Sequence, residues 1–193
     1  DGLGMLYSFE LGDDGVRLVH RDLDCETARA LAAGRRDVAG FGTPMRRRFW
    51  ERLLQPVPRM PDNTNVNIVP RGDGFVALTE TPRQLRVDPA TLAVTGEHRW
   101  GDALGALSGT AHPVFDRARR VWVDVCTDLG FKPGLVVIEH DPEGRARKVI
   151  GRWSAPRVPY VHSFGVTARS VVIVAHPLTL NPASLLFSDK GYA

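Results

Sequence analysis

Two histidines stand in sequence contexts that could support metal chemistry. His112 lies in a run of small residues, 109–113 (GTAHP), and the proline that follows favours an extended backbone at the histidine. His162 lies in residues 160–164 (YVHSF), where the two-residue period of a strand predicts one buried face carrying the imidazole, Tyr160 and Phe164. A buried imidazole needs a polar partner or a metal, because an unpaired polar group is costly in an apolar environment. The residues alone leave both interpretations open: a core histidine with a polar partner, or a metal ligand.

The remaining histidines and the cysteines give no further sign of a site. Surface positions are expected for His98 and His140, which adjoin charged residues near turns, and surface or structural roles for His20 and His176, which end strands. Cys25 and Cys126 lie far apart and neither belongs to a C-x-x-C pair, which argues against zinc and redox motifs. No P-loop, G-x-S-x-G elbow, H-E-x-x-H motif or N-x-S/T acceptor site occurs, and the glycines at positions 2 and 4 lack the third glycine of a dinucleotide fingerprint.

The elements expected to position these side chains are mostly short strands separated by turns. A hairpin is predicted from residues 5–11 and 15–20, joined by Gly-Asp-Asp. Helical segments are expected at 25–33, with Asp24 as N-cap, and from Thr43-Pro44 to Leu54. Further strands are predicted at 65–69, 74–80, 84–88, 120–126, 134–140, 147–153, 160–166 and 170–175. This spacing, without long intervening helices, predicts antiparallel sheet.

Composition excludes several classes of protein. The chain has 193 residues, 43% of them hydrophobic, and 25 Lys+Arg against 22 Asp+Glu. The dense basic stretches, 35–36 and 46–48, are short and acidic residues are interspersed elsewhere, so a nucleic-acid surface is not expected. No apolar run reaches the ~18 residues of a membrane-spanning helix, and no signal peptide is visible. The lack of a disulfide framework favours a reducing, cytoplasmic setting.

Turns of similar composition recur after the predicted strands and suggest repeated four-stranded units. Propeller blades take ~40–45 residues each, so the 130 residues after Asn63 correspond to about three blades. Because a propeller needs at least about four blades to close, an open arc is expected for this chain alone.

Several segments together resemble the carotenoid cleavage oxygenase family. Residues 110–113 (TAHP) and 161–167 (VHSFGVT) carry the resemblance, supported in the same order by 1–5 (DGLGM), 62–67 (DNTNVN) and 77–81 (ALTET). The form YVHSFGVT is most similar to the branch of retinal-forming oxygenases and their isomerohydrolase relatives. The similarity covers essentially the whole chain. It implies a single domain over 1–193: the N-terminal portion, truncated at both ends, of an all-β seven-bladed propeller with a short helical insertion near 25–55.

The resemblance also implies a metal centre and a reaction. The family holds Fe(II) on the propeller axis with four histidines, of which His112 and His162 would be the first two, and Glu80 would orient ligand histidines through hydrogen bonds. The implied reaction is O₂-dependent scission of a conjugated double bond in a carotenoid or apocarotenoid, giving two carbonyl products. The substrate would be a lipophilic polyene, and the family's use of lipophilic substrates implies peripheral contact with membranes.

Other functions remain as alternatives. The same family contains isomerohydrolases, which do not use O₂ in this way. A non-catalytic propeller that binds a partner would show no metal dependence. A calcium-dependent propeller hydrolase could use Asp62, Asn63 and Glu80, but it leaves both His112 and His162 unexplained. Because the third and fourth ligands would lie beyond Ala193, we expect the isolated chain neither to bind iron tightly nor to turn over substrate.

Overall fold

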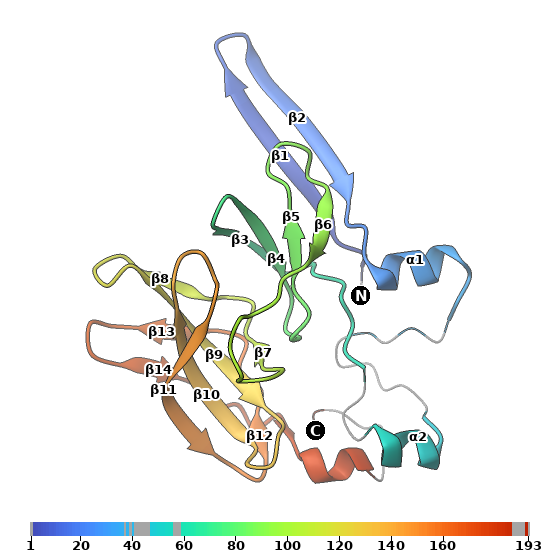
Figure 1. Ribbon diagram of the computed structural model, residues 1–193, viewed down its shortest axis with the longest axis vertical. Coiled ribbons are helices and arrows are strands. Elements are labelled where there is room, and N and C mark those ends of the chain that lie inside the picture. The colour runs from blue at the N-terminus through green and yellow to red at the C-terminus, as the bar shows by residue number, and fades with distance from the viewer. Residues whose placement is uncertain are drawn as a thin grey trace.

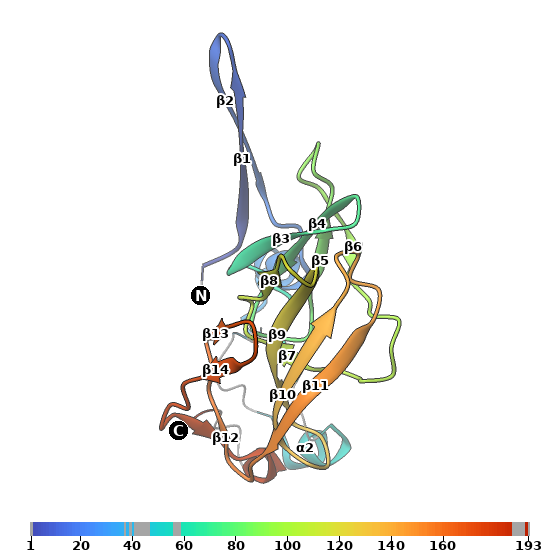
Figure 2. The ribbon, with the colours of Figure 1, turned by 90° about the vertical axis from the view of Figure 1, so that its left-hand side faces the viewer.

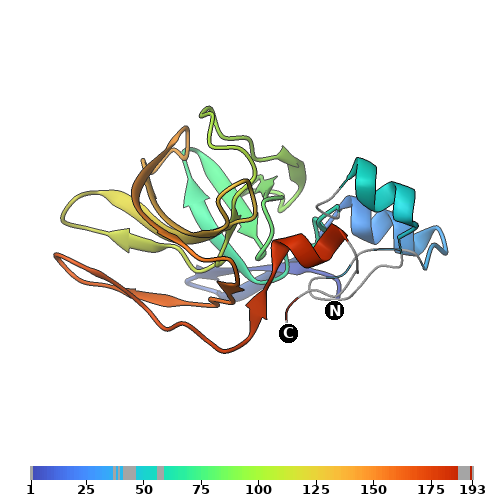
Figure 3. The same cartoon turned by 90° about the horizontal axis from the view of Figure 1, so that it is seen from below.

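The computed structural model describes residues 2–36, 38, 40, 47–55, 59–186 and 192. Within these residues the protein is mostly β, with strands in five sheets and two short α-helices. The N-terminal hairpin and the two larger sheets follow one another along the long axis, and the helices α1 (Glu26–Ala32) and α2 (Phe49–Leu54) lie to one side (Figures 1 and 3). The expectation of short antiparallel strands is confirmed, since every described strand pair is antiparallel.

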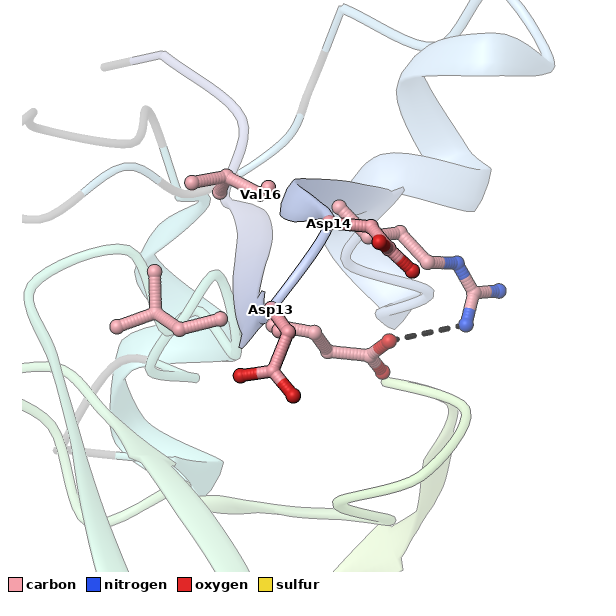
Figure 4. Close-up of a pocket in the computed structure, with 8 residues that line it drawn as sticks. Asp13, Asp14 and Val16 are labelled. Carbon is pink, nitrogen blue, oxygen red and sulfur yellow. Dashed lines mark hydrogen bonds and ion pairs between the residues drawn. The ribbon is translucent and has the colours of Figure 1, made fainter.

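The N-terminal hairpin extends away from the other sheets (Figures 1 and 2). Strands β1 (Met5–Gly12) and β2 (Gly15–Asp22) pair over their full length, as the sequence predicts. At the tip, a shallow hollow is lined by residues 10–17, and Arg17 forms an exposed ion pair with Glu10 at 2.9 Å (Figure 4). Such an exposed pair stabilises a fold little, so this tip is a turn without a built site.

The first of the two larger sheets is a four-stranded meander, in which consecutive strands are neighbours. Its strands are β3 (Asn67–Arg71), β4 (Gly74–Leu78), β5 (Leu85–Val87) and β6 (Val94–Glu97). The turn between β3 and β4 needs a left-handed residue, which Gly72 supplies with φ 59°. β6 has no counterpart among the strands expected from the sequence, because the residues of 94–97 lack a clear two-residue period.

The second larger sheet is built on β9 (Val121–Asp128), β10 (Gly134–His140) and β11 (Arg147–Ser154). Two short strands share the outer edge of β9, namely β7 (Ser108–Gly109) and β8 (Val114–Asp116). The edge strand is therefore interrupted at residues 110–113, the segment that carries His112. This interruption is what frees the histidine from the ladder.

The C-terminal part consists of two small two-stranded sheets. β12 (Val158–Pro159) pairs with β15 (Thr179–Leu180), and β13 (Phe164–Val166) pairs with β14 (Val171–Ile173). A 3₁₀ helix, Pro182–Leu186, follows. The continuous strand predicted over 160–166 is wrong: residues 160–163 lie between β12 and β13 and pair with neither sheet as strand. The backbone bends here, so the two-residue period does not set the faces of Tyr160 and His162.

The helices differ from expectation at their starts. α1 spans Glu26–Ala32, and its N-cap is Cys25, whose Sγ accepts a hydrogen bond from the Ala28 amide at 3.3 Å. Asp24, the predicted cap, instead pairs with Arg29. The first amides of α1 find their acceptor in a residue far along the sequence: the Asp62 carboxylate accepts hydrogen bonds from the Glu26 and Thr27 amides. α2 spans Phe49–Leu54, and its predicted start at 43–44 lies outside the described residues.

Separate apolar clusters join these elements. Leu23 and Cys25 pack with the four-stranded sheet through Ala77, Leu85 and Val87. The two larger sheets meet where Val69, Val76 and Leu78 pack against Ala111. The C-terminal sheets are attached through a cluster made of Val125, Leu135, Val158 and Val161. Ala111 therefore lies at the junction of the two sheets, directly before His112.

Candidate metal centre

His112 and His162 meet although 50 positions separate them in the sequence. Their ring centroids lie 4.6 Å apart with an interplanar angle of 68°. His112 comes from the interruption between β7 and β8, and His162 from the bend between β12 and β13. The two histidines singled out in the sequence are thus brought together by two breaks in regular structure.

The backbone before His112 is held by polar contacts to β9. Asp124 Oδ1 accepts hydrogen bonds from the Thr110 hydroxyl at 2.9 Å and from the Thr110 amide at 3.4 Å, and the Thr110 hydroxyl accepts from the His112 amide at 3.2 Å. Ala111 has φ 59°, a left-handed conformation that alanine rarely adopts. Pro113 has no backbone N–H to donate, so it cannot extend the hydrogen-bonded pairing with β9. These contacts hold the loop in a strained conformation, and this conformation sets the position of the His112 side chain.

A glycine is required beside this carboxylate. A Cβ on Gly109 would collide with Oδ2 of Asp124. Burial of Asp124 raises its pKa to about 6, and the Thr110 hydrogen bonds oppose that rise. The sequence gives no sign of this role for Thr110, Asp124 or Gly109, because the contact crosses between strands that pair only in the folded sheet.

His162 is positioned by Glu80 and Tyr160. Its Nδ1 lies 2.6 Å from Oε1 of Glu80, two residues after the end of β4. The Tyr160 hydroxyl donates to the same carboxylate, with both oxygens at 2.9 Å, and lies 3.2 Å from Nδ1 of His162. Burial, and then the Glu80 carboxylate, raise the pKa of Tyr160, which keeps the hydroxyl protonated as a donor. The sequence associates Tyr160 with His162 only as a neighbour on one face, and the hydrogen bond to Glu80 is a new observation.

Burial of this part of the site differs from expectation. The His162 side chain is 55% exposed in this chain, whereas Glu80 is 9% exposed. The prediction of a buried face for His162 is therefore wrong, because that residue lies in a bend and not in a strand. The carboxylate end of the contact is buried and the imidazole end is open.

The free nitrogen of His112 fits a metal ligand. His112 Nε2 is buried and has no hydrogen-bond partner, which is costly unless a further group occupies that position. A carboxylate on Nδ1 of His162 leaves Nε2 of that ring as its lone-pair nitrogen, the arrangement common for metal-bound histidine. Among the residues that the structure describes, no group of three or more His, Cys, Asp or Glu side chains gathers around a point. The described part of the chain thus brings together two candidate nitrogen ligands, Nε2 of His112 and Nε2 of His162.

Two of the remaining histidines are not at the surface. His98 and His140 are 5% and 4% exposed, so the expected surface position is wrong for both. Each packs against Trp100, with centroids at 4.7 Å and 4.9 Å. Burial, and then the charge of Arg71, lower the pKa of each ring to about 4. The adjoining charged residues suggested exposure, but the chain folds these strand ends into the space between the two sheets. His20 and His176 are exposed, as expected.

The oxygens invoked for a calcium site already have structural partners. Asp62 accepts hydrogen bonds from the first amides of α1, as described above. Asn63 Oδ1 accepts from the Gly4 amide at 2.9 Å, and its amide donates to the Gly2 carbonyl. These contacts join the N-terminal segment to the loop before β3. They account for both polar residues without a cation.

Comparisons with known proteins agree with the sequence resemblance. The chain is 34% identical to carotenoid cleavage dioxygenase 8 homolog A, chloroplastic, of Oryza sativa subsp. japonica, over 92% of this chain and 34% of the relative. It is 29% identical to beta,beta-carotene 15,15'-dioxygenase of Rattus norvegicus, over 94% of this chain and 36% of the relative. The chain therefore spans about a third of the length of these curated relatives.

The fold has a counterpart among solved structures. A mutant of Synechocystis apocarotenoid oxygenase superposes with a TM-score of 0.73 at 23% identity, covering 99% of this chain and 41% of that one. At this identity the likeness shows the fold alone. The sequence profile described as retinal pigment epithelial membrane protein (RPE65) matches residues 1–191. With nearly every residue matched, the chain belongs to the RPE65 family, which the carotenoid cleavage oxygenase resemblance anticipates.

Proposed function

We propose that His112 and His162 are two ligands of a catalytic Fe(II) centre, in an enzyme that cleaves a conjugated double bond of a carotenoid or apocarotenoid with O₂. The observation that carries the proposal is the close approach of the two imidazoles, one with a buried, unpartnered Nε2. Neutral imidazole nitrogen is a common ligand of iron. The names of the relatives supply the reaction class, since two of them are carotenoid dioxygenases.

The residues around the two ligands have separate roles in this proposal. Glu80 accepts a hydrogen bond from the Nδ1–H of His162, which fixes the tautomer and increases the basicity of the opposite nitrogen. Tyr160 donates to Glu80 and so limits rotation of that carboxylate. Thr110, held by Asp124, fixes the backbone amide of His112. When bound, Fe(II) would supply the activation of O₂ needed for scission, and the reaction requires no acid or base from the described residues.

The proposed architecture is a seven-bladed β-propeller of which this chain forms about three blades, a single domain over residues 1–193. The four-stranded sheet and the sheet built on β9 would be consecutive blades. The third and fourth iron ligands would belong to residues beyond this sequence. The coverage of 34–36% of the curated relatives supports this placement. So does the hairpin, whose apolar face carries exposed Tyr7, Phe9 and Leu11, a surface that further strands would cover.

The substrate is proposed to be a lipophilic polyene taken up from a membrane surface. α2 exposes four large apolar side chains: Phe49 (56%), Trp50 (69%), Leu53 (58%) and Leu54 (87%). Arginines flank them at 47–48, so this helix has the composition of an interfacial contact. This apolar surface is difficult to recognise in the sequence, because α2 is only six residues long. No helix among the described residues is long and apolar enough to cross a membrane. A cytoplasmic setting stays a prediction.

Iron content tests the proposal directly. We would measure iron and turnover for the 193-residue chain and for a version extended to the length of the relatives. The extended protein should hold close to one iron per chain, and the isolated chain far less. His112→Ala in the extended protein should remove iron and activity together, whereas His176→Ala, at an exposed histidine, should retain both.

The same preparation separates the alternatives. Stoichiometric O₂ consumption with aldehyde or ketone products supports the dioxygenase, and metal-dependent conversion without O₂ consumption supports an isomerohydrolase. A propeller that only binds a partner would show no metal dependence. Equal, near-unit iron occupancy in the short and extended proteins would contradict the four-ligand centre, and iron retained by His112→Ala would return His112 to a structural role.

A further inference from the structure

A small cavity lies between the two larger sheets, away from His162 and Glu80. The volume of the cavity is about 10 Å³, which is room for about one water molecule. Its polar lining consists of Arg71 at the end of β3, Gln84 before β5 and Asp124 in β9, together with His140 and Arg147. Apolar and aromatic residues complete the lining, among them Leu78, Trp100 and Ile138. We call it the inter-sheet cavity.

Two of the side chains that line this cavity, Arg71 and Gln84, have polar atoms without partners. Arg71 is 2% exposed, yet its Nε and Nη1 have no hydrogen-bond partner, and the same holds for Oε1 of Gln84, which is 9% exposed. Arg71 Nη2 lies 3.0 Å from Nε2 of His140, and the guanidinium packs over Trp122 at 4.8 Å. Within the described residues, no carboxylate forms an ion pair with Arg71. Buried donors and acceptors left in this state are rare in native proteins.

We propose that the inter-sheet cavity is a binding site for one buried water molecule, held by Arg71, Gln84 and Asp124. The water oxygen accepts a hydrogen bond from an Arg71 N–H. Its two hydrogens are donated to Gln84 Oε1 and to the Asp124 carboxylate. Three hydrogen bonds are the usual number for a buried water. One molecule would thus give a partner to Gln84 Oε1 and to one of the two unpartnered Arg71 nitrogens, and would bridge the charges of Arg71 and Asp124.

The charges around the cavity favour water over an anion. Arg147 also lines it, but its guanidinium is paired with both oxygens of Asp102, at 2.9 Å and 2.7 Å. Arg71 is left opposite Asp124, so two positive and two negative groups balance. His140 contributes an acceptor to Arg71, and its Nδ1 lies 2.8 Å from the Asp141 carbonyl, the pattern of a neutral ring. An additional anion would meet Asp124 without a spare cation.

The water site has a consequence for the loop before His112. The Asp124 oxygen that anchors Thr110 belongs to the same carboxylate that would receive the water. Arg71 and Gln84 would then steady, through one water molecule, the carboxylate that holds this loop. The inference does not depend on iron, because it rests on the cavity and its unpartnered groups alone.

A crystal structure of the chain at about 1.5 Å tests the site. We expect a density peak at hydrogen-bond distance from an Arg71 nitrogen, Gln84 Oε1 and Asp124. Bromide soaking with anomalous diffraction separates water from a halide: no anomalous peak is expected in the cavity. An empty cavity, a direct Arg71–Asp124 ion pair or a bromide peak would each overturn the proposal.

A matched pair of variants tests it in solution and in the crystal. Gln84→Met removes the acceptor at similar length, and should lower Tm by about 3–8 °C and abolish the density peak. Gln55→Met, at an exposed glutamine beside α2, should leave both unchanged. If the peak persists in Gln84→Met with the same occupancy, Gln84 is not a partner of the water and the three-residue site is wrong.

Discussion

The Glu80 carboxylate lies 2.6 Å from Nδ1 of His162, although the two residues are 82 positions apart in the sequence. Glu80 follows a strand of the four-stranded sheet, and His162 lies in a bend beside the C-terminal sheets. His162 itself lies outside the strands of those sheets. The buried carboxylate therefore determines which nitrogen of an otherwise open imidazole is available to a metal.

Replacing the carboxylate of Glu80 should weaken the metal centre without removing a ligand. In the extended protein, Glu80→Gln should lower iron affinity by roughly 10-fold or more, the usual effect of losing a carboxylate partner of a ligand histidine. The readout is competition for iron against a chelator of known affinity. Glu143→Gln, at an exposed turn, is the matched control. Unchanged affinity in Glu80→Gln would show that the carboxylate does not orient His162.

Tyr160 should act through Glu80. Tyr160→Phe keeps the ring and removes the hydroxyl that donates to both carboxylate oxygens, so we expect a smaller loss of iron affinity than in Glu80→Gln. Because Tyr160 acts through its partner, the double variant should lose no more than Glu80→Gln alone. Tyr7→Phe, on the exposed hairpin, controls for loss of a hydroxyl. Additive losses in the double variant would mean that Tyr160 contacts the centre by another route.

The sequence predicts the strands whose period is clear and misses what depends on partners. The hairpin and β10 appear where alternation and turn residues place them. His112 and His162 are recognisable because their local motifs are distinctive. The bend at 160–163 is not, since it arises where a strand changes sheets and the local pattern still alternates.

Burial of charged and polar residues is harder to predict for a physical reason. His98 and His140 stand beside charged neighbours, which locally favours solvent. Their burial comes from Trp100, in the segment between β6 and β7, and from Arg71 in β3, which meet these rings only after folding. The start of α1 follows the same logic: its first amides donate to Asp62, which lies 36 positions away in the sequence, and a local rule does not detect this contact. Both errors arise because contacts between segments far apart in the sequence are not visible in the local pattern, and the same holds for Tyr160 and Asp124 in the site.

Thr110→Val should destabilise both the fold and the ligand loop. The variant keeps the shape of the side chain but removes the hydroxyl that donates to Asp124 and accepts from the His112 amide. Loss of a partner for a buried carboxylate should lower the free energy of unfolding by about 1–3 kcal/mol. Urea unfolding of the chain measures this, and iron content of the extended protein should fall as well.

Thr95→Val is the control for this variant, because Thr95 is exposed on β6. A Thr110→Val protein with normal stability and full iron content would show that Ala111 and Pro113 hold the loop without Asp124.

Stability should fall as the pH drops from about 6.5 to about 4. His98 and His140 have pKa values of about 4 in the folded state, below the usual value of ~6.5 in an unfolded chain. Their contribution is complete above about pH 6.5 and is lost as acid protonates the unfolded chain first, on the order of 3 kcal/mol for each ring. Asp124, with its pKa raised to about 6, opposes this loss in part, because it binds a proton more tightly when folded. One carboxyl group cannot offset two imidazole rings, so the net effect of acid is to destabilise the fold.

Urea midpoints measured across this pH range should decline. His98→Gln should flatten the decline, whereas His20→Gln, at an exposed ring, should not. A midpoint that is constant or rises on acidification would show that the two rings are not buried in neutral form.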